Sequence, residues 1–169
     1  MKKRQIIQIK NVKIILIIIW MIIVFLFSNQ KGTESGNISK TVTIVIEKLL
    51  IGNNIYKSVP NFGFFETIIR KLAHFSIYTI GGFLIMNYFY DVQNENKKTN
   101  LKNKILYSIF FGAIYAVTDE LHQFFVPGRS ARIFDVIIDT FGVITGVLIY
   151  LLVIKFNNFI KNISQNRGE

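Results

Sequence analysis

The chain has 169 residues, of which 51% are apolar, and it carries a net charge of +10. Together with a positive mean hydropathy, this composition excludes an ordinary soluble domain, while the absence of cysteine excludes disulfides and thiolate metal sites. A charge of +10 would suit a nucleic-acid-binding protein if the chain were soluble. The basic residues stand mostly between and outside apolar runs, so we interpret them as charges that flank membrane helices and expect no nucleic-acid partner.

The apolar residues gather in four runs, each close to the roughly 20 residues that a helix needs to cross a bilayer. Helices are the expected spanning form, because each satisfies its backbone hydrogen bonds internally. The third run reaches a spanning length only if its helix continues through Asp119 and Glu120. The sequence therefore predicts one all-α domain over residues 1–169, a polytopic membrane protein with a four-helix transmembrane bundle. The predicted transmembrane helices cover residues 12–28, 72–90, 105–125 and 133–156.

The segment between the first two runs carries a helical pattern of its own. Its apolar residues recur at the spacing of one helix face, and Gly52 ends the pattern. The residues of that face are Ile38, Val42, Val45 and Leu49. We expect an amphipathic helix in the first outer loop, lying on the outer membrane surface or capping the bundle. Ordinary packing of this face is the alternative.

The distribution of Lys and Arg predicts the orientation of the bundle. The amino-terminal segment, the loop between the second and third runs and the carboxy-terminal tail hold 12 of these residues, whereas residues 29–71 and 119–132 hold 8. Because basic residues favour the cytoplasmic side, we expect both termini in the cytoplasm. This orientation brings polar residues from three helix ends into one layer at the outer membrane surface, which is typical of a functional site.

Polar residues at the start of the second run lie on a single helix face. Lys71, His74, Tyr78 and Gly81 follow one another at intervals of three or four residues. His74 alone would indicate a hydrogen-bonded imidazole inside the bundle. A lysine one turn earlier and a tyrosine one turn later make a functional site the competing interpretation, and Gly81 allows a neighbouring helix to come close.

Adjacent carboxylates occupy the end of the third run. Asp119 and Gln123 share a helix face, and Glu120 lies one turn before Gln123. Two neighbouring carboxylates near apolar surroundings repel each other unless a cation is close. The available cations are Arg70, Lys71 and Arg129, and a divalent metal ion is another. A structural network of ion pairs between helix ends is the alternative to a functional site.

A turn and a second polar stripe follow. Pro127 fixes one torsion and Gly128 relaxes the next, so this segment predicts a turn that carries Arg129 across the end of the bundle. A guanidinium placed there can hold a carboxylate or a phosphate. The fourth run has one stripe that is polar at its outer end and small further in, formed by Asp135, Asp139, Gly142 and Gly146. Asp139 lies deepest and must be protonated or paired.

Three blocks of the sequence resemble the VanZ-like family, over about residues 25–150. They are Ser28–Gln30, Arg70–Phe75 with Tyr78, and the segment from Asp119 to Gly146. The matching residues of the last block are Asp119, Glu120, Gln123, Phe124, Pro127, Gly128, Arg129, Asp135, Gly142 and Gly146. The family pattern usually has Asn at the position of Asp139, so no family role is carried over to that residue.

The resemblance implies a small multi-pass protein of the bacterial cytoplasmic membrane that acts on the cell envelope. The family name comes from a member associated with low-level resistance to the glycopeptide teicoplanin, so antibiotic tolerance is an expected phenotype. Three functions remain open: an enzyme acting on a lipid-linked or cell-wall substrate, a non-catalytic envelope-binding or accessory protein, and a proton- or ion-coupled carrier. The sequence names neither a reaction nor a metal.

The enzyme hypothesis assigns roles to nine residues. Carboxylates and an imidazole would serve as acid, base or metal ligands, and cations and polar groups would hold an anionic substrate. The candidate catalytic residues are Glu120, Asp119, His74 and Asp135. The candidate substrate-binding residues are Arg129, Lys71, Arg70, Gln123 and Tyr78.

Overall fold

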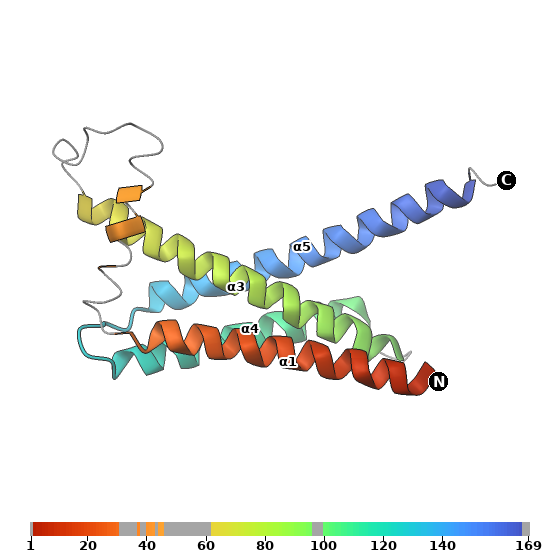
Figure 1. Ribbon diagram of the computed structural model, residues 1–169, viewed down its shortest axis with the longest axis horizontal. Helices are drawn as coiled ribbons and strands as arrows, with labels where there is room; N and C mark the ends of the chain where they lie inside the picture. The colour runs from red at the N-terminus through yellow and green to blue at the C-terminus, as the bar shows by residue number, and fades with distance from the viewer. Residues whose placement is uncertain are drawn as a thin grey trace.

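The computed structural model describes residues 2–30, 37, 40–42, 44–45, 62–95 and 100–166. Within these ranges the chain forms helices and no strands, which confirms the predicted all-α class. The long helices of the described residues are α1 (Lys2–Ser28), α3 (Phe62–Glu95), α4 (Leu101–Phe124) and α5 (Ile133–Asn166), and they are labelled in Figure 1.

Three predicted helices fall inside one helix each and the third, 105–125, exceeds α4 by one residue, whereas α1, α3 and α5 extend well beyond their runs. A hydrophobic run marks only the part of a helix that suits lipid, and polar residues can continue the same helix into water. Three helical segments are long and apolar enough to cross a membrane, namely Gln8–Ser28, Thr67–Asp91 and Ile133–Gln165. Helix α4 is not among them, because charged residues stand near both of its ends.

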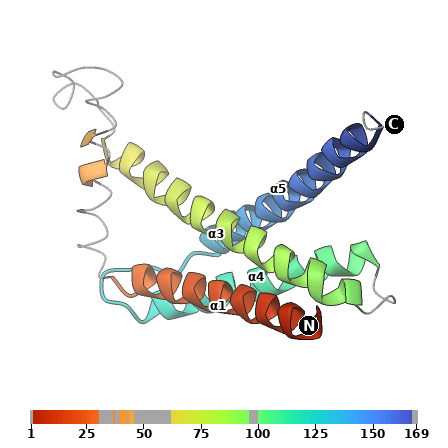
Figure 2. The same cartoon turned by 45° about the vertical axis from the view of Figure 1, so that its right-hand side comes forward.

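Helix α3 packs most extensively against α5, and the two cross near the middle of the molecule (Figure 2). Glycines permit this crossing. A Cβ added at Gly146 would lie 2.0 Å from the Thr79 carbonyl oxygen, and one added at Gly82 would lie 2.1 Å from that of Val143. The backbones are therefore in direct contact, as the small-residue stripe on α5 predicts.

The core lies where α1, α3 and α4 meet around Trp20. The indole Nε1 donates to the Ile77 carbonyl oxygen at 2.8 Å, and the Tyr115 hydroxyl donates to the Met21 carbonyl oxygen at 2.6 Å. Both aromatic residues thereby satisfy their polar atoms inside an apolar cluster. The buried members of this cluster are Ile17, Trp20, Val24, Tyr78, Ile85, Ala116 and, from α5, Val143.

Large apolar side chains also cover the outer surfaces of the four helices. Phe110 on α4 and Leu152 on α5 are each 65% exposed, and α1 exposes Ile15, Ile18, Ile19 and Ile22. Exposed apolar surface this continuous is unusual for a protein surrounded by water and fits one surrounded by lipid. The chain therefore has the surface of a membrane helix bundle.

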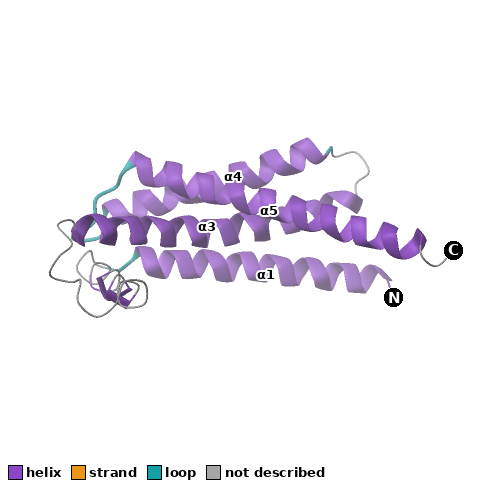
Figure 3. Ribbon diagram, turned by 90° about the horizontal axis from the view of Figure 1, so that it is seen from above, coloured by secondary structure: helices purple, strands orange, loops and turns teal. Residues whose placement is uncertain are grey.

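The helix ends gather at the two opposite ends of the bundle (Figure 3), and the polar side chains at each end form a layer. Near the middle of α1, Lys13 forms an ion pair with Asp91 of α3, and Asn100 caps the start of α4. The end of α5 lies toward this same side. The opposite layer contains the end of α1, the beginning of α3, the end of α4 and the beginning of α5.

The predicted amphipathic helix lies mostly outside the described residues. Asn37, residues 40–42 and residues 44–45 are helical, and Val42 and Val45 are exposed. The positions of Ile38 and Leu49 fall outside the described ranges.

Candidate functional site

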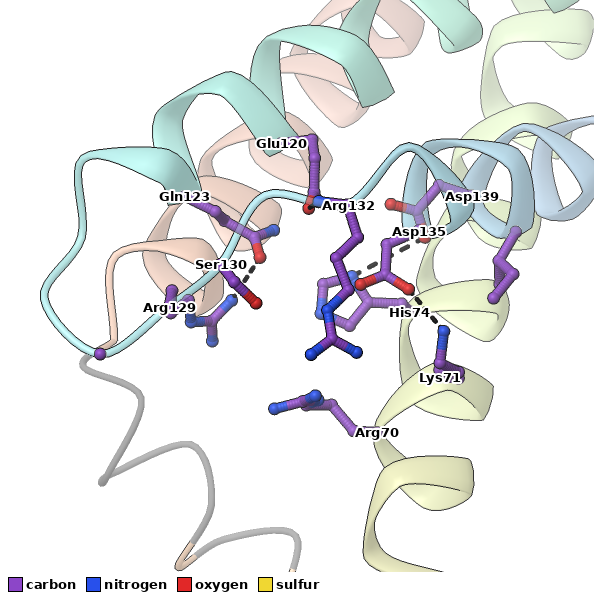
Figure 4. Close-up of a pocket in the computed structure, with 12 residues that line it drawn as sticks. Arg70, Lys71, His74, Glu120, Gln123, Arg129, Ser130, Arg132, Asp135 and Asp139 are labelled. Carbon is purple, nitrogen blue, oxygen red and sulfur yellow. Dashed lines mark hydrogen bonds and ion pairs between the residues drawn. The ribbon is translucent and has the colours of Figure 1, made fainter. Parts of the chain in front are cut away.

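A polar pocket of about 210 Å³ opens in the layer formed by the beginnings of α3 and α5 and the end of α4 (Figure 4). Its lining residues are Arg70, Lys71, His74, Glu120, Gln123, Gly128, Arg129, Ser130, Arg132, Asp135, Ile138 and Asp139. Seven of the nine predicted site residues are among them, so residues far apart in sequence do share one pocket. The other two, Asp119 and Tyr78, are buried and do not line it.

The turn after α4 builds one wall of the pocket. Gly128 has a φ of 76°, a conformation that other residues rarely adopt, and the Arg129 backbone N–H donates to the Val126 carbonyl oxygen at 3.1 Å. The predicted turn is therefore present. It directs Arg129 toward the end of α1, where Nε donates to the Gln30 carbonyl oxygen at 3.0 Å and Nη2 to that of Phe27 at 3.1 Å.

Gln123 connects this arginine to a buried carboxylate. Its Oε1 accepts from Arg129 Nη1 at 2.9 Å, and its Nε2 donates to Asp119 Oδ2 at 3.0 Å. Asp119 and Gln123 therefore share a helix face as predicted. These two hydrogen bonds fix the orientation of the Gln123 amide. The amide therefore connects the Arg129 guanidinium to the Asp119 carboxylate.

Glu120 holds the segment that leads into α5. Its Oε1 accepts the backbone N–H of Arg132, and its side chain is buried within the pocket wall. One of the two carboxylate oxygens of Glu120 is therefore engaged in a hydrogen bond with the backbone. The contact positions Arg132, which leaves the guanidinium of that residue beside the pocket opening (Figure 4).

An ion pair joins the two helices that cross. Lys71 Nζ lies 2.6 Å from Asp135 Oδ1, and both side chains are about 30% exposed. Because α3 begins at Phe62, Arg70 and Lys71 lie in the third turn of this helix rather than at a helix start, where the hydropathy pattern places them. The earlier start is explained by polar and aromatic residues that continue the helix outside the apolar run.

His74 faces Asp139 across the same two helices. Nδ1 lies 3.7 Å from Asp139 Oδ1, too far for a hydrogen bond, and Asp139 is only 1% exposed. Neither carboxylate oxygen of Asp139 has a hydrogen-bond partner among the described residues, and the same holds for His74 Nδ1 and the Tyr78 hydroxyl. Burying a polar atom without a hydrogen-bond partner costs free energy of folding. A cluster of such atoms is therefore unusual in a folded protein.

The cations around the pocket differ in what they contact. Burial lowers the pKa of the Arg129 guanidinium, and the charge of Arg70 lowers it further. In the described part of the chain, the guanidinium groups of Arg70 and Arg132 form neither hydrogen bonds nor ion pairs, and both face the opening (Figure 4). An anion between these groups would relieve their mutual repulsion.

Sequence reasoning did not select every residue of the pocket. Arg132 was missed, although a cation just before the fourth run is the signal that could have found it. The sequence pattern marks Asp139 only as a deep ionisable group and Gly128 only as a turn residue. No chemical pattern distinguishes Ser130 or Ile138 in the sequence.

The apolar outer surface, the crossing helices and the polar pocket at one end define a helical membrane protein with a candidate binding site. The family model for VanZ/LLP1 matches residues 13–154, and the chain therefore belongs to the VanZ family. No curated protein and no solved structure matched the chain.

Proposed function

We propose that this protein binds an anionic group of a lipid-linked or cell-wall substrate at the outer face of the bacterial cytoplasmic membrane. The observation that carries the proposal is the pair of unpaired guanidinium groups, Arg70 and Arg132, beside a pocket whose wall also contains Arg129. Planar guanidinium groups hold phosphate and carboxylate oxygens in pairs. A pocket at a membrane surface suits a substrate whose head is charged and whose tail remains in lipid.

The orientation is part of the same proposal. Four helices would cross the membrane, with α4 crossing as a less apolar member protected by its neighbours. Both termini would lie in the cytoplasm because the basic residues favour that side. The pocket would then face outward, where cell-wall precursors are used, and loss of its function would change tolerance to a glycopeptide such as teicoplanin.

A reaction on the bound substrate would use the acidic and basic groups opposite the cations. Glu120 keeps one carboxylate oxygen beyond its contact with the Arg132 backbone, and His74 presents an imidazole from the facing helix. These groups could move a proton to or from a substrate held by the two arginines. Gln123 and Asp119 would position the surrounding residues.

A non-catalytic binding or accessory protein is the second candidate. The observation that favours it is that two of the acidic groups in the pocket already hold the fold together. Asp135 pairs with Lys71, and Glu120 accepts a backbone N–H. Such a protein would bind the same anionic group without turnover and change how the envelope meets the antibiotic.

The proposal is tested by binding of a polyprenyl phosphate to purified protein in detergent. Replacing both Arg70 and Arg132 with Gln should weaken binding by at least about 100-fold, since each charge-assisted contact contributes about 1.5–3 kcal/mol. Lys102→Gln is the matched control, because it removes an exposed cation near the start of α4, in the other polar layer. Equal binding by the double variant and the wild type would contradict the proposal.

A further inference from the structure

We propose that His74, Asp119 and Asp139 form a buried site for a divalent transition-metal ion that adjoins the pocket. The three residues come from three helices, which are α3, α4 and α5. One ligand atom from each lies within 4.8 Å of the other two. The packing of α3, α4 and α5 thus brings a nitrogen and two carboxylates close together.

These distances suit a metal ion after a small adjustment. Transition metals bind imidazole nitrogen and carboxylate oxygen at about 2.0–2.2 Å, which places neighbouring ligand atoms about 3–4 Å apart. His74 Nδ1 and Asp139 Oδ1 are already 3.7 Å apart. That separation is too long for a hydrogen bond and is within the range for two ligands of the same ion.

Unpartnered buried atoms supply a second observation. Asp139 is 1% exposed, and neither of its carboxylate oxygens has a hydrogen-bond partner among the described residues. Tyr78 is fully buried, and its hydroxyl also has no hydrogen-bond partner among the described residues. Several orphaned groups at one point indicate that a partner is shared between them.

The charges of the three residues and their neighbours also favour a bound cation. Lys71 is paired with Asp135, and Arg129 reaches Asp119 only through the Gln123 amide. Two carboxylates therefore face one imidazole in surroundings that are shielded from water. A divalent cation compensates both carboxylates while leaving His74 neutral, which is the form that binds metal.

The combination of one nitrogen ligand and two oxygen ligands indicates which class of metal ion the site binds. Mg²⁺ and Ca²⁺ prefer oxygen ligands alone, whereas a mixture of imidazole and carboxylate suits Zn²⁺, Mn²⁺ or Fe²⁺. Three protein ligands leave coordination positions open, as in catalytic rather than structural sites. His74 and Asp139 also line the pocket, so an open position would face the anion proposed to bind there.

The metal site rests on this geometry and not on the proposed function. Failure to bind metal would leave anion binding by Arg70 and Arg132 unaffected. Conversely, an unchanged affinity for polyprenyl phosphate in the Arg70/Arg132 variant would leave the metal site intact. The two proposals are therefore tested by different variants and different measurements.

The experiment uses the full-length protein in detergent, treated with EDTA, exposed to Zn²⁺, Mn²⁺ or Mg²⁺ and then desalted. Elemental analysis should find one Zn²⁺ or Mn²⁺ ion per chain and no retained Mg²⁺, and Zn²⁺ should raise the melting temperature. Loss of an outer-shell partner alone costs about 10- to 100-fold in metal affinity, so Asp119→Asn, Asp139→Asn and His74→Gln should each cost at least as much.

Asp91→Asn is the matched control. It removes an aspartate that pairs with Lys13 in the other polar layer, and it should bind metal like the wild type. Absence of bound Zn²⁺ and Mn²⁺ from the wild type would overturn the proposal. Equal binding by the wild type and the three ligand variants would also overturn it, because the ion would then lie elsewhere.

A measurement on the wild type keeps the test decisive if a variant fails to accumulate. Electron spin echo spectroscopy of the Mn²⁺-loaded protein should show coupling to an imidazole nitrogen, because His74 is a ligand. A spectrum without nitrogen coupling would overturn the assignment.

Discussion

Lys71 and Asp135 form an ion pair of 2.6 Å that ties the third turn of α3 to the first turn of α5. The pair lies at the rim of the pocket, where both side chains remain partly exposed. It therefore fixes the spacing of the two helices that carry His74 and Asp139.

The first prediction concerns this pair. Lys71→Met and Asp135→Asn should each lower the melting temperature, and a double-mutant cycle should give a coupling energy of roughly 1 kcal/mol, as expected for a partly exposed pair. A loss of about 1 kcal/mol corresponds to a fall of about 2–4 °C in the melting temperature of a protein of this size. Thermal unfolding in detergent measures it, and strictly additive effects would show that the pair contributes no coupling.

Arg129→Lys tests the contacts of the turn. A lysine keeps the charge but cannot replace the three hydrogen bonds to Gln123, Gln30 and Phe27. We expect the variant to lose about 1–3 kcal/mol of stability and to accumulate at a lower level. If it instead melts like the wild type, the guanidinium does not hold the end of α1, and a role in substrate binding alone would be favoured.

Gly146→Ala tests the contact between α3 and α5. The added Cβ would lie 2.0 Å from the Thr79 carbonyl oxygen and 2.6 Å from the Phe83 nitrogen, so the helices must separate. Overpacking of this kind costs about 1–3 kcal/mol. Leu148→Ala is the control, because this nearby side chain on the same helix is exposed. Equal melting temperatures for the two variants would argue against the close crossing.

Two substitutions of Glu120 separate structural support from chemistry. Glu120→Gln retains an oxygen that accepts the Arg132 backbone N–H, whereas Glu120→Ala leaves this partly buried donor without its partner. Glu120→Ala should therefore lose about 1–3 kcal/mol of stability, while Glu120→Gln should reach the membrane at normal levels. If the protein is an enzyme, Glu120→Gln also abolishes any glycopeptide tolerance that the wild type confers. Full tolerance at normal abundance would favour the accessory function.

The positions of the helices could be predicted from the sequence because lipid imposes a simple requirement. Runs of about 20 apolar residues mark where a helix contacts hydrocarbon, and each predicted run coincides with one helix of the structure to within one residue or lies inside it. The ends could not be predicted in the same way. Outside the lipid a helix continues or stops according to its caps, so α3 begins at Phe62, ten residues before the predicted start.

The gathering of polar residues could also be predicted, because topology brings alternate helix ends to one layer. Gly146 and its stripe indicated the close approach that brings α5 against α3. The proximity of His74 to Asp139 depends on how α3 and α5 cross. The spacing of residues along the sequence does not encode this crossing. Arg132 was missed for a related reason, since its position depends on the backbone contact with Glu120.

The most direct test of an outward-facing pocket is the labelling of single cysteines in intact cells. The chain has no cysteine of its own, so Ser130→Cys at the pocket and Lys102→Cys near the start of α4 give a clean comparison. We expect a membrane-impermeant thiol reagent to label Ser130→Cys in intact cells and to label Lys102→Cys only after permeabilisation. The reverse pattern would place the pocket in the cytoplasm and contradict a function at the outer face.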